Sequence, residues 1–135
     1  MIEVDAGLRP PQPEALCLIP AIRVRYEPEY VLITLAGEVG FAVVASLRER
    51  LFALAVSGRP MVADLDRVSF IDAAGLGVLA GAARQAAAHG ASLRVVCARR
   101  RVRRLFSLTR LDQAVPLAAS LAEAREAAGA DAEAV

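Results

Sequence analysis

Apolar and polar residues alternate in the first part of the chain and then recur at a helical spacing. The stretches IRVRY (22–26) and YVLITLAG (30–37) alternate or are β-branched, and the short EPE segment between them suits a turn. They predict an antiparallel hairpin. From residue 41 to residue 56 apolar positions recur at helical spacing, with arginine and glutamate interspersed, until SGRP ends the pattern. This stretch predicts an amphipathic helix.

Strands and helices alternate over the rest of the sequence. MVADL (61–65) predicts a short buried strand, the polar DRVSFID (66–72) a turn, and the alanine-rich stretch 73–89 a long helix that stops at Gly90. After these, SLRVVC predicts a strand, VRRLFSLT a helix, AVPL a last short strand and SLAEAREAAG a terminal helix. Strands joined by helices of these lengths favour parallel pairing. The sequence therefore predicts a single α/β domain with a mixed, mostly parallel sheet, an initial antiparallel hairpin and about four helices.

Chain length and the placement of proline predict the domain organisation. A chain of 135 residues fits one domain. Residues 1–20 are proline-rich and are expected to form a flexible arm, residues 21–128 the folded domain, and residues 129–135 a frayed tail. The start carries acids where a signal peptide needs positive charge, and no segment approaches the roughly 18 uninterrupted apolar residues of a membrane span. We expect a cytoplasmic protein without direct membrane insertion.

Composition limits the chemistry of the chain. Its 16 basic residues, all arginine, face 15 acidic residues for a net charge of +1, which disfavours a general binder of polyanions. Cys17 and Cys97 lie in apolar stretches without metal-ligand or redox spacing, so we expect reduced, buried thiols. His89 is the only histidine, and no nucleophile and base can be assembled around it. The sequence predicts no cofactor, no metal and no enzymatic activity.

Two longer stretches resemble a known family. DLDRVSFIDAAGLGVLAGA and RRLFSLTRLDQAVPLAASLAEA, together with the AGEV turn, are similar to STAS domains of the anti-sigma-factor antagonist type. The resemblance covers nearly all of residues 21–128. It implies a compact α/β domain that binds an anti-sigma factor, a histidine-kinase-like serine kinase. It also implies a partner-binding surface made of Gly37, Glu38, Gly40, Asp72, Ala73, Ala74, Gly75 and Gly77.

This sequence departs from the family pattern at three positions. The family's phospho-acceptor, a serine or threonine directly after the motif aspartate, corresponds to Ala73, and the next residue, Ala74, also lacks a hydroxyl. Gly40 stands where the family usually has aspartate, and Arg110 stands where glycine is common. Ser69 is the nearest hydroxyl, in a predicted turn where serine tends to bond its own backbone. We therefore expect a binding module without the usual phosphorylation switch.

Asp72 also suits a purely structural role. A carboxylate just before a helix accepts hydrogen bonds from the free N–H groups of the first turn and opposes the positive end of the helix dipole. An N-cap and a partner contact are compatible, because the cap leaves the neighbouring small residues available. The sequence predicts both for Asp72.

Other functions stay open at this point. An accessory STAS subunit of a membrane transporter or signalling scaffold needs no phospho-acceptor, because assembly is its function. Gly75, Gly77 and Gly81 form a G-x-G-x-x-x-G pattern that, with Arg99 as a 2′-phosphate binder, suggests an NADP-dependent enzyme, although the polar segment 66–72 separates the pattern from the strand. The run ARRRVRR (98–104) suggests nucleic acid binding as a function, yet no stacking aromatic residues accompany it. We expect a protein partner and no nucleic acid, and a homodimer stays open.

Overall fold

The computed structural model describes residues 21–134, which form a five-stranded mixed sheet. The strand order is β1-β2-β3-β4-β5. The strands are β1 (Ala21–Tyr26), β2 (Val31–Val39), β3 (Met61–Ile71), β4 (Leu93–Val96) and β5 (Leu117–Ala118). β1 and β2 pair antiparallel, and every later pair is parallel. The predicted arm at 1–20, with Cys17, lies outside the described residues.

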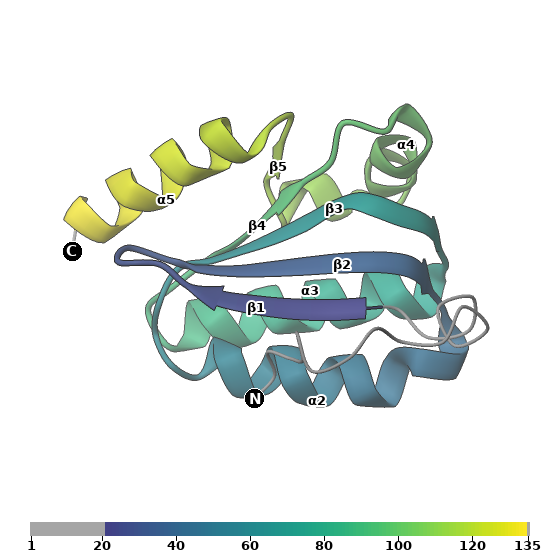
Figure 1. Cartoon of the computed structure of the whole chain (residues 1–135), viewed down its shortest axis with the longest axis horizontal. Helices are drawn as coiled ribbons and strands as arrows, with labels where there is room; N and C mark the ends of the chain where they lie inside the picture. The colour runs from purple at the N-terminus through teal and green to yellow at the C-terminus, as the bar shows by residue number, and fades with distance from the viewer. Residues whose placement is uncertain (1–20, 135) are drawn as a thin grey trace, which may run out of the picture.

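Four α-helices accompany the sheet in the described part of the chain. They are α2 (Val44–Ala55), α3 (Ala73–Ala88), α4 (Arg100–Leu108) and α5 (Leu121–Ala134), with short 3-10 turns η1 (Phe41–Val43) and η2 (Leu111–Gln113). α2 and α3 run side by side on one side of the sheet, and α5 lies on the other (Figure 1). The predicted α/β fold is confirmed. The last helix is longer than predicted, because α5 extends beyond residue 129 to Ala134.

The sheet buries a different apolar cluster on each face. Neighbouring residues of a strand point to opposite faces. Ile33 of β2 therefore belongs to the larger cluster, which includes Leu79 of α3 and Phe106 of α4, whereas Leu32 belongs to a smaller cluster that includes Ala124 of α5. The fully buried side chains are mainly aliphatic. This core holds the carboxyl ends of β2 and β3 beside the start of α3.

The segment 66–72, predicted as a turn, forms the second half of β3 up to Ile71. In the pairing with β2 the register shifts at two places, and β3 contributes an extra residue at each. These bulges break the two-residue alternation, so that Leu65, Val68 and Ile71 are buried with polar or exposed residues between them. The turn prediction was wrong because this pattern lacks the period of a regular strand.

The AGEV turn (36–39) of the family resemblance is likewise part of a strand. β2 continues through Gly37 and Glu38 to Val39. Gly37 has a φ of 90°, a left-handed conformation that glycine adopts at little cost, next to the second register shift. Gly40 then links β2 directly to η1. The strand ends close to the start of α3 without a long flexible loop.

Arg110 is the single non-glycine residue with a positive φ among the described residues (φ 62°, ψ 17°). A Cβ atom makes this left-handed conformation unfavourable, and glycine avoids the penalty. Arg110→Gly is therefore expected to raise the free energy of unfolding by about 0.5–1 kcal/mol, once the greater chain entropy of glycine is subtracted. Urea denaturation measures the change. A lower stability in the variant would show that contacts of the arginine side chain outweigh the backbone strain.

Candidate protein-binding site

Asp72 joins the two segments that the sequence assigned to one surface. It is the N-cap of α3, where its Oδ1 accepts a hydrogen bond from the Gly75 backbone N–H at 3.0 Å. Its Oδ2 accepts a second hydrogen bond from the Phe41 backbone N–H, also at 3.0 Å. The predicted cap is confirmed. One carboxylate therefore fixes the start of α3 to the start of η1, across the ends of β2 and β3.

These hydrogen bonds favour the charged form of Asp72. The Gly75 N–H lowers the pKa of the carboxyl below its ordinary value of 3.8, desolvation opposes this effect, and the Phe41 N–H lowers the pKa further. The net shift is downward. The charged carboxylate therefore stabilises the fold at every pH above the ordinary pKa, and this contribution is lost as the pH falls through the lowered pKa.

Asp72→Asn is expected to lower the melting temperature at neutral pH. Asparagine keeps a cap acceptor for Gly75, but it carries no charge and cannot accept two hydrogen bonds with two oxygens. The difference from wild type should shrink as the pH falls below 3.8, because the wild-type carboxyl then takes up its proton. Thermal melts followed by circular dichroism at several pH values test this. A difference that does not change with pH would contradict the electrostatic role.

Two glycines permit the close approach of these segments. A Cβ at Gly75 would lie 2.5 Å from the Val39 carbonyl oxygen and 2.9 Å from Cγ1 of Ile71. Real Cβ contacts are not this short, so α3 can begin here only with glycine. At Gly40 a Cβ would lie 3.1 Å from Oδ2 of Asp72. An aspartate at position 40, as in the family pattern, would thus begin directly against the Asp72 carboxylate.

The predicted partner-binding residues come together at this end of the sheet, but they are not equally accessible. Glu38, Ala73 and Gly77 are exposed, Gly37, Gly40, Asp72 and Ala74 are half-buried, and Gly75 is buried. Gly75 therefore serves the internal packing of α3. A Cβ at Gly77 would meet nothing within 4 Å, so the outer side of the first turns of α3 is bare.

Two exposed phenylalanines flank these residues. Phe41 is 82% exposed and Phe70 is 51% exposed, which is unusual for such apolar side chains. Phe70 lies beside Gly40, because its Cε2 is 3.5 Å from the position of a Gly40 Cβ. We call the following set the Asp72 surface: Glu38, Gly40, Phe41, Phe70, Asp72, Ala73, Ala74 and Gly77. It combines aromatic side chains with bare backbone.

Phe70 is absent from the predicted site residues because segment 66–72 was interpreted as a turn. The signal in the sequence was the adjacency of Phe70 and Ile71. Ile71 is buried at the end of β3, and its neighbour therefore faces outward. A strand assignment would have identified Phe70 as an exposed aromatic residue next to Asp72.

The residues that were considered for an enzymatic function form contacts within the fold. A Cβ at Gly81 would lie 2.9 Å from Cζ of Phe52, so this glycine lets α2 pack against α3. Arg99 Nε donates a hydrogen bond to the Asp66 carbonyl oxygen at 3.0 Å. His89 ends α3, with Nδ1 3.0 Å from the Gln85 carbonyl oxygen. Gly75 and Gly81 of the glycine pattern thus serve packing, whereas Gly77 faces open space.

Cys97 lies in the apolar core, in an environment that favours the neutral thiol. Its side chain is fully buried, as predicted, and its thiol is free in the described residues. Burial raises the pKa of the thiol, since desolvation disfavours the thiolate. Among residues 21–134, no group of three histidine, cysteine or acidic side chains could hold a metal ion. None of the helices in this range is long and apolar enough to cross a membrane.

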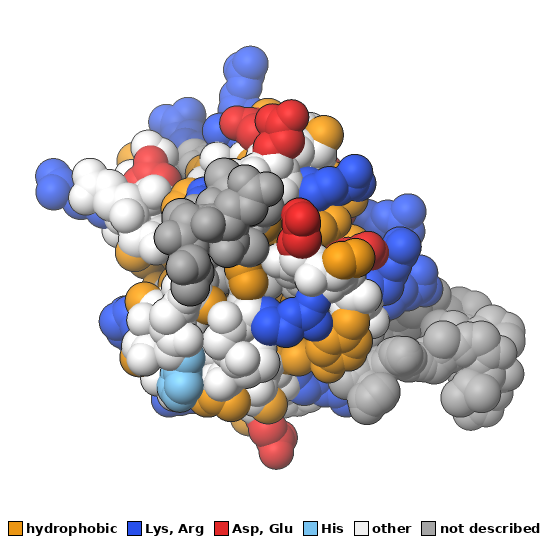
Figure 2. All heavy atoms as spheres, turned by 90° about the vertical axis from the view of Figure 1, so that its left-hand side faces the viewer, with side chains coloured by type: hydrophobic (Ala, Val, Ile, Leu, Met, Phe, Trp, Pro, Cys, Tyr) orange, Lys and Arg blue, Asp and Glu red, His pale blue; other side chains and the backbone are white. Residues whose placement is uncertain are grey.

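The end of the molecule opposite the Asp72 surface has a different character. Figure 2 shows this face, where side chains of both signs are interspersed with hydrophobic ones. Its β1–β2 turn region carries a local ion pair between Arg25 and Glu27 at 3.3 Å, and the exposed Tyr26 lies under the Arg59 guanidinium at 5.8 Å. The exposed tyrosine on this face is thus already in contact with a cation of the same chain.

The sequence and the fold both have known relatives. The sequence-family model of the STAS domain matches residues 21–124 of this chain. The chain is 31% identical over 98 residues to the anti-sigma-B factor antagonist of Bacillus subtilis (strain 168), covering 73% of this chain and 90% of the relative. The crystal structure of an anti-sigma factor antagonist from Mycobacterium paratuberculosis is similar with a TM-score of 0.74 and 25% identity, over 81% of this chain and 93% of that one. These relatives are regulatory proteins.

A more distant similarity concerns a membrane protein. The murine Slc26a9 anion transporter contains a part with this fold, with a TM-score of 0.67 and 20% identity, over 80% of this chain and 19% of the transporter. At this identity the likeness shows the fold alone. The fold and the relatives of the antagonist type support a regulatory role in protein binding. With the family match over residues 21–124, they show that this chain belongs to the STAS domain family.

Proposed function

We propose that this protein is an anti-sigma-factor antagonist that binds an anti-sigma factor of the serine-kinase type through the Asp72 surface. The kind of relative supports this partner, since the similar proteins from Bacillus subtilis and Mycobacterium paratuberculosis are antagonists of anti-sigma factors. The observation that carries the proposal is the double hydrogen bond of Asp72. It holds the backbone of the exposed Phe41 beside the first turn of α3, whose residues Ala73 and Ala74 carry no charge. The complex would form in the cytoplasm.

The chemistry of the Asp72 surface suits a protein partner. Phe41 and Phe70 offer apolar area that a partner pocket can remove from water, and buried aromatic side chains contribute strongly to interfaces. Both oxygens of Asp72 already accept backbone hydrogen bonds, so the carboxylate is partly satisfied before a partner arrives. The small residues Ala73, Ala74 and Gly77 let another backbone approach α3 closely.

In this proposal the antagonist is always in its binding-competent form. Phosphorylation at the start of a helix is compatible with the helix itself, because the free N–H groups and the dipole favour an anion there. A phosphate would therefore act by adding charge to the interface. Ala73 and Ala74 cannot accept phosphate, and Ser69 lies exposed on β3 before the cap. Regulation would come from the amounts of the two proteins instead of a covalent switch.

The purified protein is expected to accept no phosphate from its serine-kinase partner. The reason is the missing oxygen nucleophile at positions 73 and 74. Intact-mass spectrometry after incubation with the kinase and ATP should show an unchanged mass, and Ala73→Ser serves as the positive control. Stoichiometric phosphate on Ser69 or Thr109 of the wild type, with loss of partner binding, would contradict the lost switch.

A capture experiment from the native cytoplasm tests the function itself. Wild type and Ala73→Glu serve as matched baits, and bound proteins are identified by mass spectrometry. We expect a serine-kinase-type anti-sigma factor on the wild type and its loss on Ala73→Glu, because the charge would lie in the interface. Equal capture of that protein by both baits would show that the interface lies elsewhere on the molecule. Capture of transporter components instead would contradict the proposed partner.

The second candidate is an accessory subunit of a transporter or a signalling scaffold. The observation in its favour is the STAS-like fold within the murine Slc26a9 transporter. Such a module also needs no phospho-acceptor. The antagonist is preferred because this chain matches 90% of the length of the relative at 31% identity, whereas it matches 19% of the length of the transporter.

A further inference from the structure

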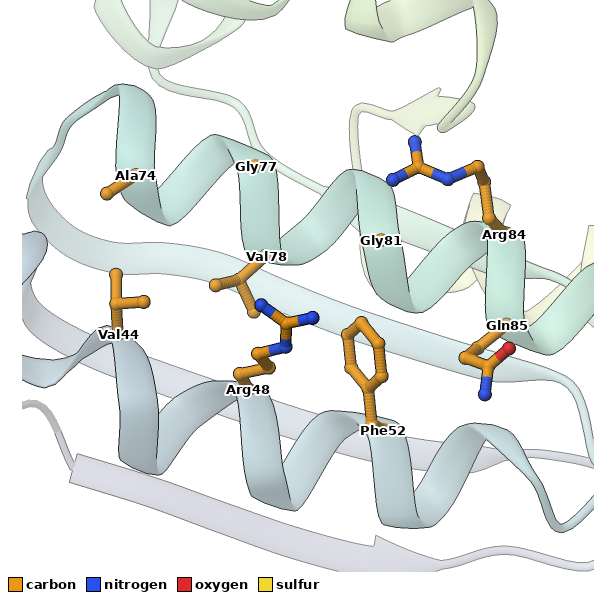
Figure 3. Close-up of a pocket in the computed structure, with 9 residues that line it drawn as sticks. All are labelled: Val44, Arg48, Phe52, Ala74, Gly77, Val78, Gly81, Arg84 and Gln85. Carbon is orange, nitrogen blue, oxygen red and sulfur yellow. The ribbon is translucent and has the colours of Figure 1, made fainter.

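A groove lies between α2 and α3 and opens beside the Asp72 surface (Figure 3). Its volume is about 470 Å³. Ala74 and Gly77, two residues of the Asp72 surface, line one end of it. The groove therefore continues this surface along α3 toward the other end of the molecule.

The groove exists because α3 lacks side chains along this line. Gly77 and Gly81 are four residues apart and so lie on the same face of the helix. A Cβ at Gly77 would meet nothing within 4 Å, and one at Gly81 would lie 2.9 Å from the tip of the Phe52 ring. Phe52 thus occupies the space at Gly81, whereas the space at Gly77 is open.

Two arginines line this groove, one from each helix. The Arg48 guanidinium lies 5.0 Å from the centroid of the Phe52 ring, a cation–π distance, and Figure 3 shows it between α2 and α3. From α3, Arg84 folds back along its helix, with Nη2 3.9 Å from the position of a Gly81 Cβ. Among the residues that the structure describes, no carboxylate lines the groove. Neither guanidinium forms an ion pair with a carboxylate of residues 21–134.

We propose that this groove binds an acidic segment of the partner protein, with carboxylates facing Arg48 and Arg84. The inference rests on the proposed function, because it extends the same contact surface. Guanidinium groups without a partner carboxylate present donors in the geometry that carboxylates accept. A protein segment fits better than a small free anion, because the groove is open and runs on from Ala74 into the Asp72 surface.

A titration followed by nuclear magnetic resonance tests the groove without the natural partner. The probes are a synthetic helical peptide of alanine and glutamate, the same peptide with glutamine for glutamate, and ATP. We expect the glutamate peptide to shift the backbone amide signals of Gly77 and Gly81 in the ¹⁵N-labelled full chain, and the glutamine peptide to leave them unchanged. The variants Arg48→Glu and Arg84→Glu should abolish the shifts. Arg50→Glu, an exposed arginine of α2 outside the groove, should preserve them.

Three results would overturn the inference. Equal shifts with both peptides would remove the role of charge, and shifts confined to the arginines of α4 would place the acidic contact there. Shifts at Gly77 with ATP but not with the glutamate peptide would make the groove a small-anion site. Melting temperatures of Arg48→Glu and Arg84→Glu serve as the folding control.

Binding measurements with the captured partner distinguish a failure of this inference from a failure of the proposed function. Arg48→Glu should weaken its binding about tenfold, because reversal of a charge at a matched ion pair turns attraction into repulsion. Arg50→Glu should bind like the wild type. If Arg48→Glu also bound like the wild type while Ala73→Glu lost binding, the groove inference would fail and the proposed function would stand. If Ala73→Glu kept its affinity while Arg48→Glu lost it, the groove inference would stand and the proposed binding through the Asp72 surface would fail.

Discussion

Ala73→Asp is expected to weaken binding of the anti-sigma factor about a hundredfold or more, while the fold keeps its stability. Ala73 is exposed at the first position of α3. A negative charge there interacts favourably with the helix dipole, by about 0.3–1 kcal/mol at an exposed position, so unfolding cannot explain lost binding. In the complex, the new carboxylate would be buried without a matching cation, at an effective cost of several kcal/mol.

Calorimetric titration of the partner into wild type, Ala73→Asp and Ala73→Ser measures this effect, with thermal melts as the stability control. Ala73→Ser should bind like the wild type until it is phosphorylated, because an unmodified hydroxyl adds little volume and no charge. Unchanged affinity in Ala73→Asp would place the binding surface elsewhere. It would then favour the accessory subunit over the antagonist.

Gly75→Ala is expected to lower the free energy of unfolding by about 2–3 kcal/mol, because the added methyl group overpacks a site that cannot expand. The new Cβ would lie 2.5 Å from the Val39 carbonyl oxygen, a backbone atom within the β2–β3 pairing. Relief requires a shift of α3 away from the sheet, which would also lengthen the hydrogen bond from Gly75 to Asp72.

Gly77→Ala is the matched control on the same helix. A Cβ at this position meets nothing within 4 Å, and alanine is the better helix former. The free energy of unfolding of this variant should therefore rise by about 0.5–1 kcal/mol. Urea denaturation of both variants against the wild type gives the two changes. Similar stability of Gly75→Ala and Gly77→Ala would contradict the packing role of Gly75.

The sequence predicted most of the fold because its hydrophobic pattern is regular where the elements are regular. The hairpin, the first amphipathic helix and the alanine-rich α3 follow periods that identify them without knowledge of tertiary contacts. The second half of β3 could not be predicted in this way. Its two bulges depend on pairing with β2, and pairing of distant segments leaves no regular period in β3 itself.

The site was predictable where it follows from local chain chemistry. The cap at Asp72 needs only a carboxylate before a helix, and the small residues after it can be read directly. The hydrogen bond from the Phe41 N–H to Asp72 spans 31 positions in the chain, so the sequence gives no sign of it without the family resemblance. Phe70 beside Gly40, and Arg48 in the groove next to α3, likewise depend on tertiary packing.

The most direct test of the account is amide hydrogen exchange of this protein with and without its captured partner. Exchange of an amide slows where a partner covers or stabilises the backbone. We predict slower exchange in the complex at residues 38–43 and 72–78, which include η1 and the first turns of α3. Slower exchange confined to α4 or α5, with unchanged exchange at residues 38–43 and 72–78, would contradict binding through the Asp72 surface.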